Sequence, residues 1–390
     1  MGELESLLLV LALIYLSECL VWVRRGALAI RNWRGRNSRI VDPGALLGNQ
    51  RGGFLLANPL PPLGNVFVSP WFPVSLSPDG LFAYSSSCLS GAGRASQTAR
   101  YVRFEDILDV AIDGRQVLVN GGILLCATST FAARSLVESL GRLRTLPRSG
   151  RAEAIKRLVR DGLDADAVSR RLGECRSRSG RIPILSNTLF VYLFLVVVPL
   201  VWRYGFGQFG LWLLGGMLAQ TITIAILFRR AHRVLYPAAG EERFKLFLTM
   251  LLAPPTAIRA PDILARHLLE DFHPLAAAKV LCQAEDFKRF ARRVLLDLRY
   301  PLHPICPVNE PAAIASEQWF RAAMGEAVEK FIQQVGLEAH ELTLAPMRTE
   351  PANQSYCPRC GAQFVVREGT CVDCGGRPLE RFGSAEAETR

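Results

Sequence analysis

Four cysteines near the end of the sequence have the spacing of a metal site. Cys357 and Cys360 form one CxxC pair, Cys371 and Cys374 form a second, and a glycine follows each pair. A CxxC turn directs two thiolates at one ion. Two such turns complete the tetrahedron that Zn²⁺ prefers, with Zn–S distances of about 2.3 Å. Each glycine lets the chain turn so that backbone amides can point at the sulfurs. These residues predict a zinc site.

Residues 356–379 resemble the zinc-ribbon family, with the apolar segment AQFVV as the strand between the two knuckles. The resemblance implies a small surface offered to protein or nucleic acid. A redox CxxC pair and an iron–sulfur cluster are the competing interpretations of the four cysteines. Four thiolate ligands leave no position for water, so we expect a structural rather than a catalytic zinc. Such thiolates need a reducing compartment, and we expect the other six cysteines to be reduced as well.

Three hydrophobic segments predict membrane spans. Residues 6–23, 182–202 and 204–228 carry together one acidic residue, Glu18, and no basic residue. Each is about as long as the ~20 residues that cross a bilayer. Arginines follow the first span (Arg24, Arg25) and the third (Arg229, Arg230, Arg233), and we expect these five to lie at anionic lipid headgroups.

The arginines also predict the orientation of the chain. The net charge is +11, and six arginines without an acidic residue occupy positions 24–39. Basic residues gather on the cytoplasmic side of membrane proteins. We therefore expect a multi-pass protein of the bacterial inner (cytoplasmic) membrane with its N-terminus outside and its C-terminus cytoplasmic. Because topology accounts for the excess charge, nucleic acid is disfavoured as a partner.

Three polar side chains inside the predicted spans form a second candidate site. Glu18, Gln220 and Thr223 could line a pathway, since ionisable groups in membranes are often functional. The alternatives are that Glu18 pairs with Arg24 or Arg25 and that the other two join helices. A further segment, 244–253, is too short to span. It is expected either to lie at the interface or to be a buried helix.

The first cytoplasmic region should contain a sheet. Short strands are predicted at 81–86, 101–104, 107–112, 116–120 and 123–128, with Asp113-Gly114 and Asn120-Gly121 as hairpin turns. Ser129 then caps an amphipathic helix. In this order of elements, residues 80–146 resemble the bacterial pleckstrin-homology-like domains, which implies a binding or assembly module.

The expected fold is an α+β membrane protein with three transmembrane helices, a cytoplasmic antiparallel β-rich module with a C-terminal helix, a cytoplasmic helical bundle and a zinc ribbon. The expected segments are an N-out anchor (1–23), the β-rich module with basic flanks (24–181), a transmembrane hairpin (182–228), an interfacial helix with the bundle (229–345), a linker (346–355), the ribbon (356–379) and a disordered tail (380–390).

Two functions are compatible with this organisation. The favoured one is a non-enzymatic scaffold or adaptor that presents the ribbon and the membrane-surface module to a cytoplasmic protein partner. The alternative is a small oligomeric transport or channel subunit that uses Glu18, Gln220 and Thr223. Catalysis is disfavoured, because no nucleophile, base and oxyanion donor can be combined from the sequence.

Overall fold

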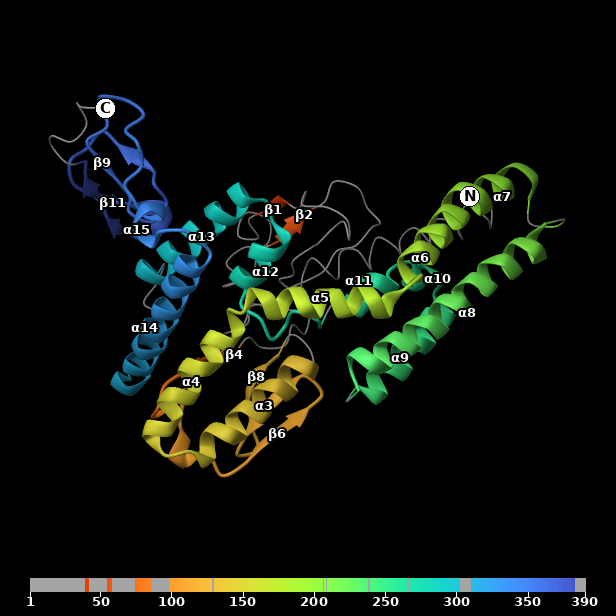
Figure 1. Ribbon diagram of the computed structural model, residues 1–390, viewed down its shortest axis with the longest axis horizontal. Coiled ribbons are helices and arrows are strands. Elements are labelled where there is room, and N and C mark those ends of the chain that lie inside the picture. The colour runs from red at the N-terminus through yellow and green to blue at the C-terminus, as the bar shows by residue number, and fades with distance from the viewer. Residues whose placement is uncertain are drawn as a thin grey trace. The chain divides into compact units, whose positions relative to one another are not determined.

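A computed structural model describes residues 39–41, 55–57, 74–85, 98–127, 130–301 (apart from 206, 208, 238 and 266) and 310–382 (Figure 1). These residues form two compact units, and each of them is assembled from separated segments of the chain. The predicted span at 6–23, with Glu18, Arg24 and Arg25, lies outside the described residues. So do Cys19, Cys88 and Cys306.

The first unit is built mainly from residues 164–284. Its helices are α5 (Ala165–Ser179), α6 (Ile182–Val191), the π-helical η2 (Tyr192–Val197), α7 (Val198–Tyr204), α8 (Gly210–Leu235), α9 (Gly240–Leu252), α10 (Pro254–Ile258), α11 (Ala260–Ala265) and α12 (Pro274–Leu281). The unit also holds the antiparallel pair β1 (Arg39–Val41) and β2 (Leu55–Ala57) and the first residues of α3 (Thr130–Thr145).

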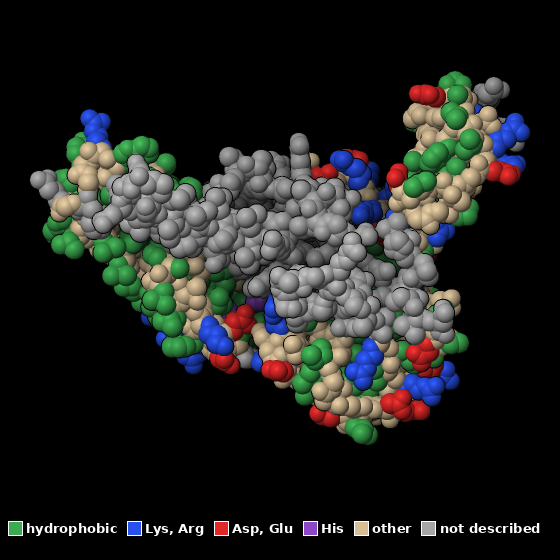
Figure 2. Space-filling view, turned by 180° about the vertical axis from the view of Figure 1, so that it is seen from behind, with side chains coloured by type: hydrophobic (Ala, Val, Ile, Leu, Met, Phe, Trp, Pro, Cys, Tyr) green, Lys and Arg blue, Asp and Glu red, His purple; other side chains and the backbone are tan. Residues whose placement is uncertain are grey.

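Two helices of this unit are long and apolar enough to cross a membrane. They are Ile182–Tyr204, which joins α6, η2 and α7, and Gly210–Leu235, which is α8, with 23 and 26 residues. At about 1.5 Å per residue both exceed the ~30 Å of a hydrocarbon core. Hydrophobic side chains cover much of the outer surface of this helical pair (Figure 2). These two helices support an association with the membrane.

The two limbs of this hairpin meet at a glycine. A Cβ on Gly216 would lie 2.5 Å from the Tyr192 hydroxyl oxygen, so no larger residue fits without movement. The Tyr192 hydroxyl donates to the carbonyl of Leu213 at 3.0 Å. Glycine at this contact allows close approach of the helices, as small residues commonly do between membrane helices.

The second unit combines a β-rich part with a helical part and the cysteine segment. Its strands and helices are β3 (Val74–Leu76), β4 (Gly80–Ser85), β5 (Thr98–Arg103), the 3₁₀ turn η1 (Phe104–Asp106), β6 (Val110–Asp113), β7 (Gln116–Val119), β8 (Gly122–Cys126), α4 (Arg148–Gly162), α13 (Ala284–Arg299), α14 (Pro311–Gln334) and α15 (Ala339–Leu342). The strands form two antiparallel three-stranded sheets, β3-β4-β5 and β6-β7-β8.

The strand predictions agree with these sheets to within a few residues at each end. The Asn120-Gly121 turn is confirmed, because both residues have positive φ, 51° and 74°. The Asn120 carboxamide also accepts from the amides of Leu108 (2.8 Å) and Asp109 (3.1 Å), which joins the turn to the start of β6. Asn fits this turn because it tolerates the left-handed conformation and supplies hydrogen bonds of its own.

One prediction about the cysteines is wrong. Cys126, which ends β8, is disulfide-bonded. None of the other described cysteines is in a disulfide. Cys175 is free and fully buried, as expected, and burial raises the pKa of its thiol to about 12.

Helix α14 packs against β3, β4 and α4, so segments far apart in sequence make one core. The Ser316 hydroxyl contacts the carbonyl of Gly80 at 3.5 Å. At the surface, Lys156 of α4 pairs with Glu326 of α14 at 3.5 Å. The sheet precedes the hairpin in the chain and α14 follows it, so this unit is completed only after both limbs have been made.

The Gly216 contact predicts opposite effects for two adjacent glycines. Gly216→Ala should destabilise the hairpin by about 1–3 kcal/mol, because the new methyl group overlaps the Tyr192 hydroxyl. Gly215→Ala is the matched control, since a Cβ there meets nothing within 4 Å. It should be neutral or stabilising by up to ~1 kcal/mol through helix propensity. Thermal unfolding in detergent measures both, and equal midpoints for the two variants would contradict the contact.

Candidate metal centre

The four predicted cysteines come together at the tips of two small β-structures. The first pair follows β9 (Ser355–Tyr356), which lies between β10 (Gln363–Phe364) and β13 (Glu380–Arg381). The second pair occupies the end of β11 (Thr370–Cys371) and the 3₁₀ turn η3 (Val372–Cys374), and β12 (Arg377–Pro378) pairs with β11. Each tip therefore presents two thiols from one tight turn.

The geometry of the sulfurs fits a tetrahedral ion. All four Sγ atoms lie within 4.8 Å of one another. The Sγ atoms of Cys360 and Cys371 are 3.8 Å apart, which equals the spacing of about 3.8 Å that follows from four bonds of ~2.3 Å in a tetrahedron. The cluster is therefore compatible with a structural metal that would be held by Cys357, Cys360, Cys371 and Cys374.

Backbone geometry directs the turns at the sulfurs, as the glycines predicted. Gly361 and Gly375 have φ of 74° and 65°, in the left-handed region. Burial alone would raise the pKa of the Cys357 thiol, but the backbone amides of Cys360 and Arg359 point at its sulfur. The pKa consequently lies below its usual value. Burial raises the pKa of the Cys360 thiol to about 12 and also raises that of the Cys374 thiol, so of these three thiols only Cys357 is favoured as a thiolate before an ion binds.

The cysteines themselves form the core of this segment. Cys357, Cys371 and Cys374 are buried, and only Phe364 and Leu379 pack against them as partly buried hydrophobic residues. So small an apolar cluster cannot stabilise a folded segment of this length without a further cross-link such as a disulfide or a metal. A bound metal would supply the missing free energy of folding.

Arg359 connects the cluster to α13. It lies inside the first CxxC pair, with one guanidinium nitrogen 3.9 Å from the Cys374 sulfur and the other 2.5 Å from Asp297 of α13. Its side chain is 15% exposed. Four thiolates around a divalent ion carry a net charge of −2, so a buried guanidinium beside them offsets part of that charge. No local pattern in the sequence indicates this contact, because Asp297 is 62 residues away.

A second contact between the cysteine segment and α13 involves Tyr300, which follows that helix. The guanidinium of Arg377 lies 5.0 Å from the centre of the Tyr300 ring. The Tyr356 hydroxyl donates to Glu380 at 2.8 Å, and burial together with this bond raises the pKa of Tyr356 to about 12. The cysteine segment is thus attached to the helical part by aromatic and ionic contacts as well as by the chain.

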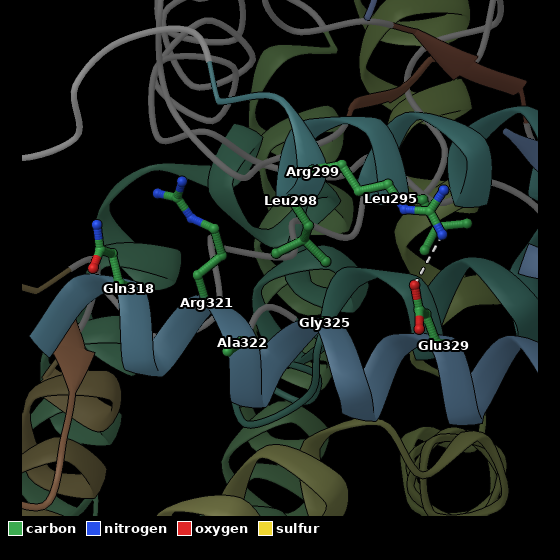
Figure 3. Close-up of a pocket in the computed structure, with 8 residues that line it drawn as sticks. All are labelled: Leu295, Leu298, Arg299, Gln318, Arg321, Ala322, Gly325 and Glu329. Carbon is green, nitrogen blue, oxygen red and sulfur yellow. Dashed lines mark hydrogen bonds and ion pairs between the residues drawn. The ribbon is translucent and has the colours of Figure 1, made fainter. Parts of the chain in front are cut away.

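A shallow groove of about 270 Å³ lies between α13 and α14 (Figure 3). Leu295, Leu298, Ala322 and Gly325 make its apolar part. Two arginines line it, but each is paired within the protein: Arg299 with Glu329 at 3.0 Å and Arg321 with Glu317 at 3.4 Å. The lining holds no serine, cysteine or histidine, so these residues do not assemble a nucleophile and base.

The predicted intramembrane residues are placed only in part. Gln220 and Thr223 both lie on α8, and the Thr223 hydroxyl donates to the carbonyl of Ala219 at 2.8 Å, within its own helix. Thr221 does the same with Met217. The Gln220 side-chain oxygen is buried without a hydrogen-bond partner. Glu18 is outside the described residues, so a site that combines it with Gln220 and Thr223 stays a prediction.

The predicted lipid-surface arginines of α8 can also be located. Arg229, Arg230 and Arg233 are exposed on the last turns of that helix. Arg24 and Arg25, the remaining two, are outside the described residues. The three arginines stand where the apolar part of α8 ends, which is where charged groups meet headgroups if the helix spans a bilayer.

Comparison with known proteins adds no family. No protein-family model matches the chain, and neither a curated protein nor a solved structure matches it significantly. The description of the metal centre therefore depends on its own residues and geometry.

Arg359→Ala should weaken metal binding about 10- to 100-fold, because it removes a group that contacts a ligand sulfur. It should also increase hydrogen exchange in α13 around Asp297. Arg367→Ala is the matched control, since Arg367 lies in the same segment and bonds only the exposed side chain of Gln354, at 2.9 Å. Metal competition titration and exchange mass spectrometry measure the two effects. Equal affinities for both variants would rule out a role of Arg359 at the metal.

Proposed function

We propose that this protein is a non-enzymatic membrane scaffold or adaptor that holds a zinc ribbon and a β-rich binding module on the cytoplasmic side of a bacterial inner membrane. The observation that carries the proposal is the composition of the second unit. It joins the sheet that precedes the hairpin to the helices and metal centre that follow it. This composition supports a hairpin that crosses the membrane twice and has both of its flanks on one side.

The identity of the ion follows from the donor set. Four thiolates in a tetrahedral arrangement favour Zn²⁺ or an iron–sulfur cluster over hard cations such as Mg²⁺ and Ca²⁺. We prefer zinc because all four sulfurs lie within 4.8 Å of one another, close to the spacing of about 3.8 Å around a single tetrahedral ion. The free cysteines of this cluster agree with a reducing compartment, and the exposed arginines at the end of α8 agree with the cytoplasmic side.

The disulfide at Cys126 points the other way, since disulfides are rare in the cytosol. A topology experiment decides between the two sides. We expect a reporter fused after residue 390 and an epitope inserted in the exposed turn at Gly114 to be cytoplasmic together. Finding both outside would refute the cytoplasmic assignment, and finding them on opposite sides would refute the two-span hairpin.

Exposed apolar side chains on the metal-binding segment support a protein partner. Val372, inside the second CxxC pair, is 88% exposed, and Val365 is 61% exposed. Apolar groups that stay in water around a rigid site are characteristic of interaction surfaces. The proposal for the ribbon is therefore recognition of a cytoplasmic protein through the surface around Val365 and Val372. A resemblance of the β-rich part to pleckstrin-homology-like domains would be consistent with a second binding surface.

Metal analysis provides the first test of the proposal. The purified full chain should contain one zinc per molecule, and Cys360→Ser should lower this content at least tenfold, because three thiolates and a weak hydroxyl replace four thiolates. Cys175→Ser is the control, since Cys175 is buried elsewhere and free. Iron with inorganic sulfide in place of zinc would refute the zinc assignment.

Capture of a partner provides the second test. Val372→Asp should reduce the recovery of the captured cytoplasmic protein about tenfold, which corresponds to ~1.4 kcal/mol. Leu344→Asp is the matched control, because Leu344 is 51% exposed in the same unit and lies on neither the metal-binding segment nor the β-rich part. Recovery of the chain alone from mild detergent, or equal losses for both variants, would contradict recognition through the knuckle.

A further inference from the structure

Helix α9 separates charged from uncharged residues along its length. All four of its charged residues (Glu241, Glu242, Arg243 and Lys245) are among its first six positions, and Leu246 to Leu252 are uncharged. A helix that lies flat on a membrane instead has its polar residues along one side. The axial pattern indicates a helix that points into the apolar layer with its charged end outside.

The direction of α9 agrees with this pattern. It packs against α8 and returns beside it (Figure 1). At the turn, the Arg243 guanidinium donates to the carbonyl of Tyr236 at 3.1 Å. Farther along, the guanidinium of Arg229 lies 5.5 Å from the centre of the Phe247 ring. From Phe247 the helix continues for five residues, about 8 Å at ~1.5 Å per residue, beside the uncharged part of α8.

One side of α9 is uncovered by the described chain. Phe244, Leu248 and Leu252 follow one another at intervals of four residues and are 60%, 44% and 77% exposed. Met250 faces the other way and is fully buried. The Thr249 hydroxyl donates to the carbonyl of Lys245 at 2.8 Å, so the polar group in the uncharged half is satisfied within the helix. This side can enter hydrocarbon without losing a hydrogen bond.

The chain turns back at the end of α9. Pro254 begins α10, where Ala257 and Ile258 are buried. The Ser186 hydroxyl of α6 donates to the carbonyl of Ala257 at 3.1 Å. A turn inside a membrane is tolerated only where protein covers its backbone, and α6 and α8 both pack against α10.

A buried polar network fixes the charged end of α9. The Thr130 hydroxyl donates to one Glu242 oxygen at 2.8 Å, and the other Glu242 oxygen lies 3.4 Å from Nε2 of His267. Nδ1 of the same imidazole lies 3.0 Å from Glu270. This network fixes the start of α9 in polar surroundings. The apolar end of the helix then extends along α8.

We propose that α9 and α10 form a half-inserted wedge in the leaflet at the arginine-rich end of α8, and that Phe244, Leu248 and Leu252 contact phospholipid. The wedge reaches about 8 Å beyond Arg229, which is less than the ~15 Å of one leaflet. In the half of α8 that ends at the arginines, Ile222 and Ile226 are also exposed, at 39% and 42%. The inference depends on the membrane hairpin of the proposed function.

Site-specific photocrosslinking tests the wedge in the full chain. A benzophenone amino acid is placed at Leu248, at Leu252, at Trp212 on α8 and at Arg292, a partly exposed position of α13. The protein is reconstituted in nanodiscs of phosphatidylglycerol and phosphatidylethanolamine, irradiated and examined by mass spectrometry. We expect phospholipid adducts from positions 248, 252 and 212, at least tenfold above the adduct from position 292.

The control positions separate two ways of failing. Lipid adducts at 212 without adducts at 248 and 252 would overturn the wedge and leave the hairpin intact. Lipid adducts at none of the three positions would overturn the hairpin as well. Crosslinks from 248 or 252 to a second copy of the chain, seen as a species of twice the mass, would show that protein covers this side and would also overturn the wedge.

Discussion

The packing of α14 on the strands β3 and β4 is the contact on which the rest of the arrangement depends. It closes a core between a sheet that begins near residue 74 and a helix that ends at Gln334. Residues 164–284, which are made between these two elements, belong to the first unit, so the chain leaves the second unit and returns to it. For a chain with two candidate membrane helices in that interval, the return requires an even number of crossings. A packing contact of buried side chains thus constrains topology more directly than the distribution of charge does.

The metal centre depends on the same unit in another way. Its apolar core is small, so a bound metal and the contacts with α13 would supply much of its stability. Arg359 contributes to the metal site and to the contact with α13, since its guanidinium reaches the Cys374 sulfur and Asp297. Occupancy of the site and attachment of the segment are therefore linked energetically through one side chain.

Local patterns in the sequence predicted local structure well. The two CxxC pairs predicted the cysteine cluster because the ligands within each pair are three residues apart and the turn itself positions them. The Asn120-Gly121 hairpin was predictable for the same reason, since its conformation depends on two adjacent residues. Two of the three predicted spans correspond to long apolar helices, and the first lies outside the described residues.

What the sequence could not predict depends on contacts between distant segments. No periodic pattern in the sequence predicts the pairing of Arg359 with Asp297 or the packing of α14 on the sheet. The segment 244–253 was predicted to be interfacial or buried, but its composition did not reveal the direction of α9. That direction becomes clear only from contacts with α8. The disulfide at Cys126 was missed because isolated cysteines carry no spacing information.

The long interval inside the second unit has a consequence for synthesis. Gly80 and Ser316, which touch in the finished protein, are separated by 236 residues. At a synthesis rate of about 5–20 residues per second, the helix that covers these strands is made on the order of 10–50 seconds after them. Meanwhile both limbs of the hairpin emerge and can enter the membrane. The apolar residues of β3 and β4 are without α14 during this delay, so both candidate membrane helices are synthesised before this core can be completed.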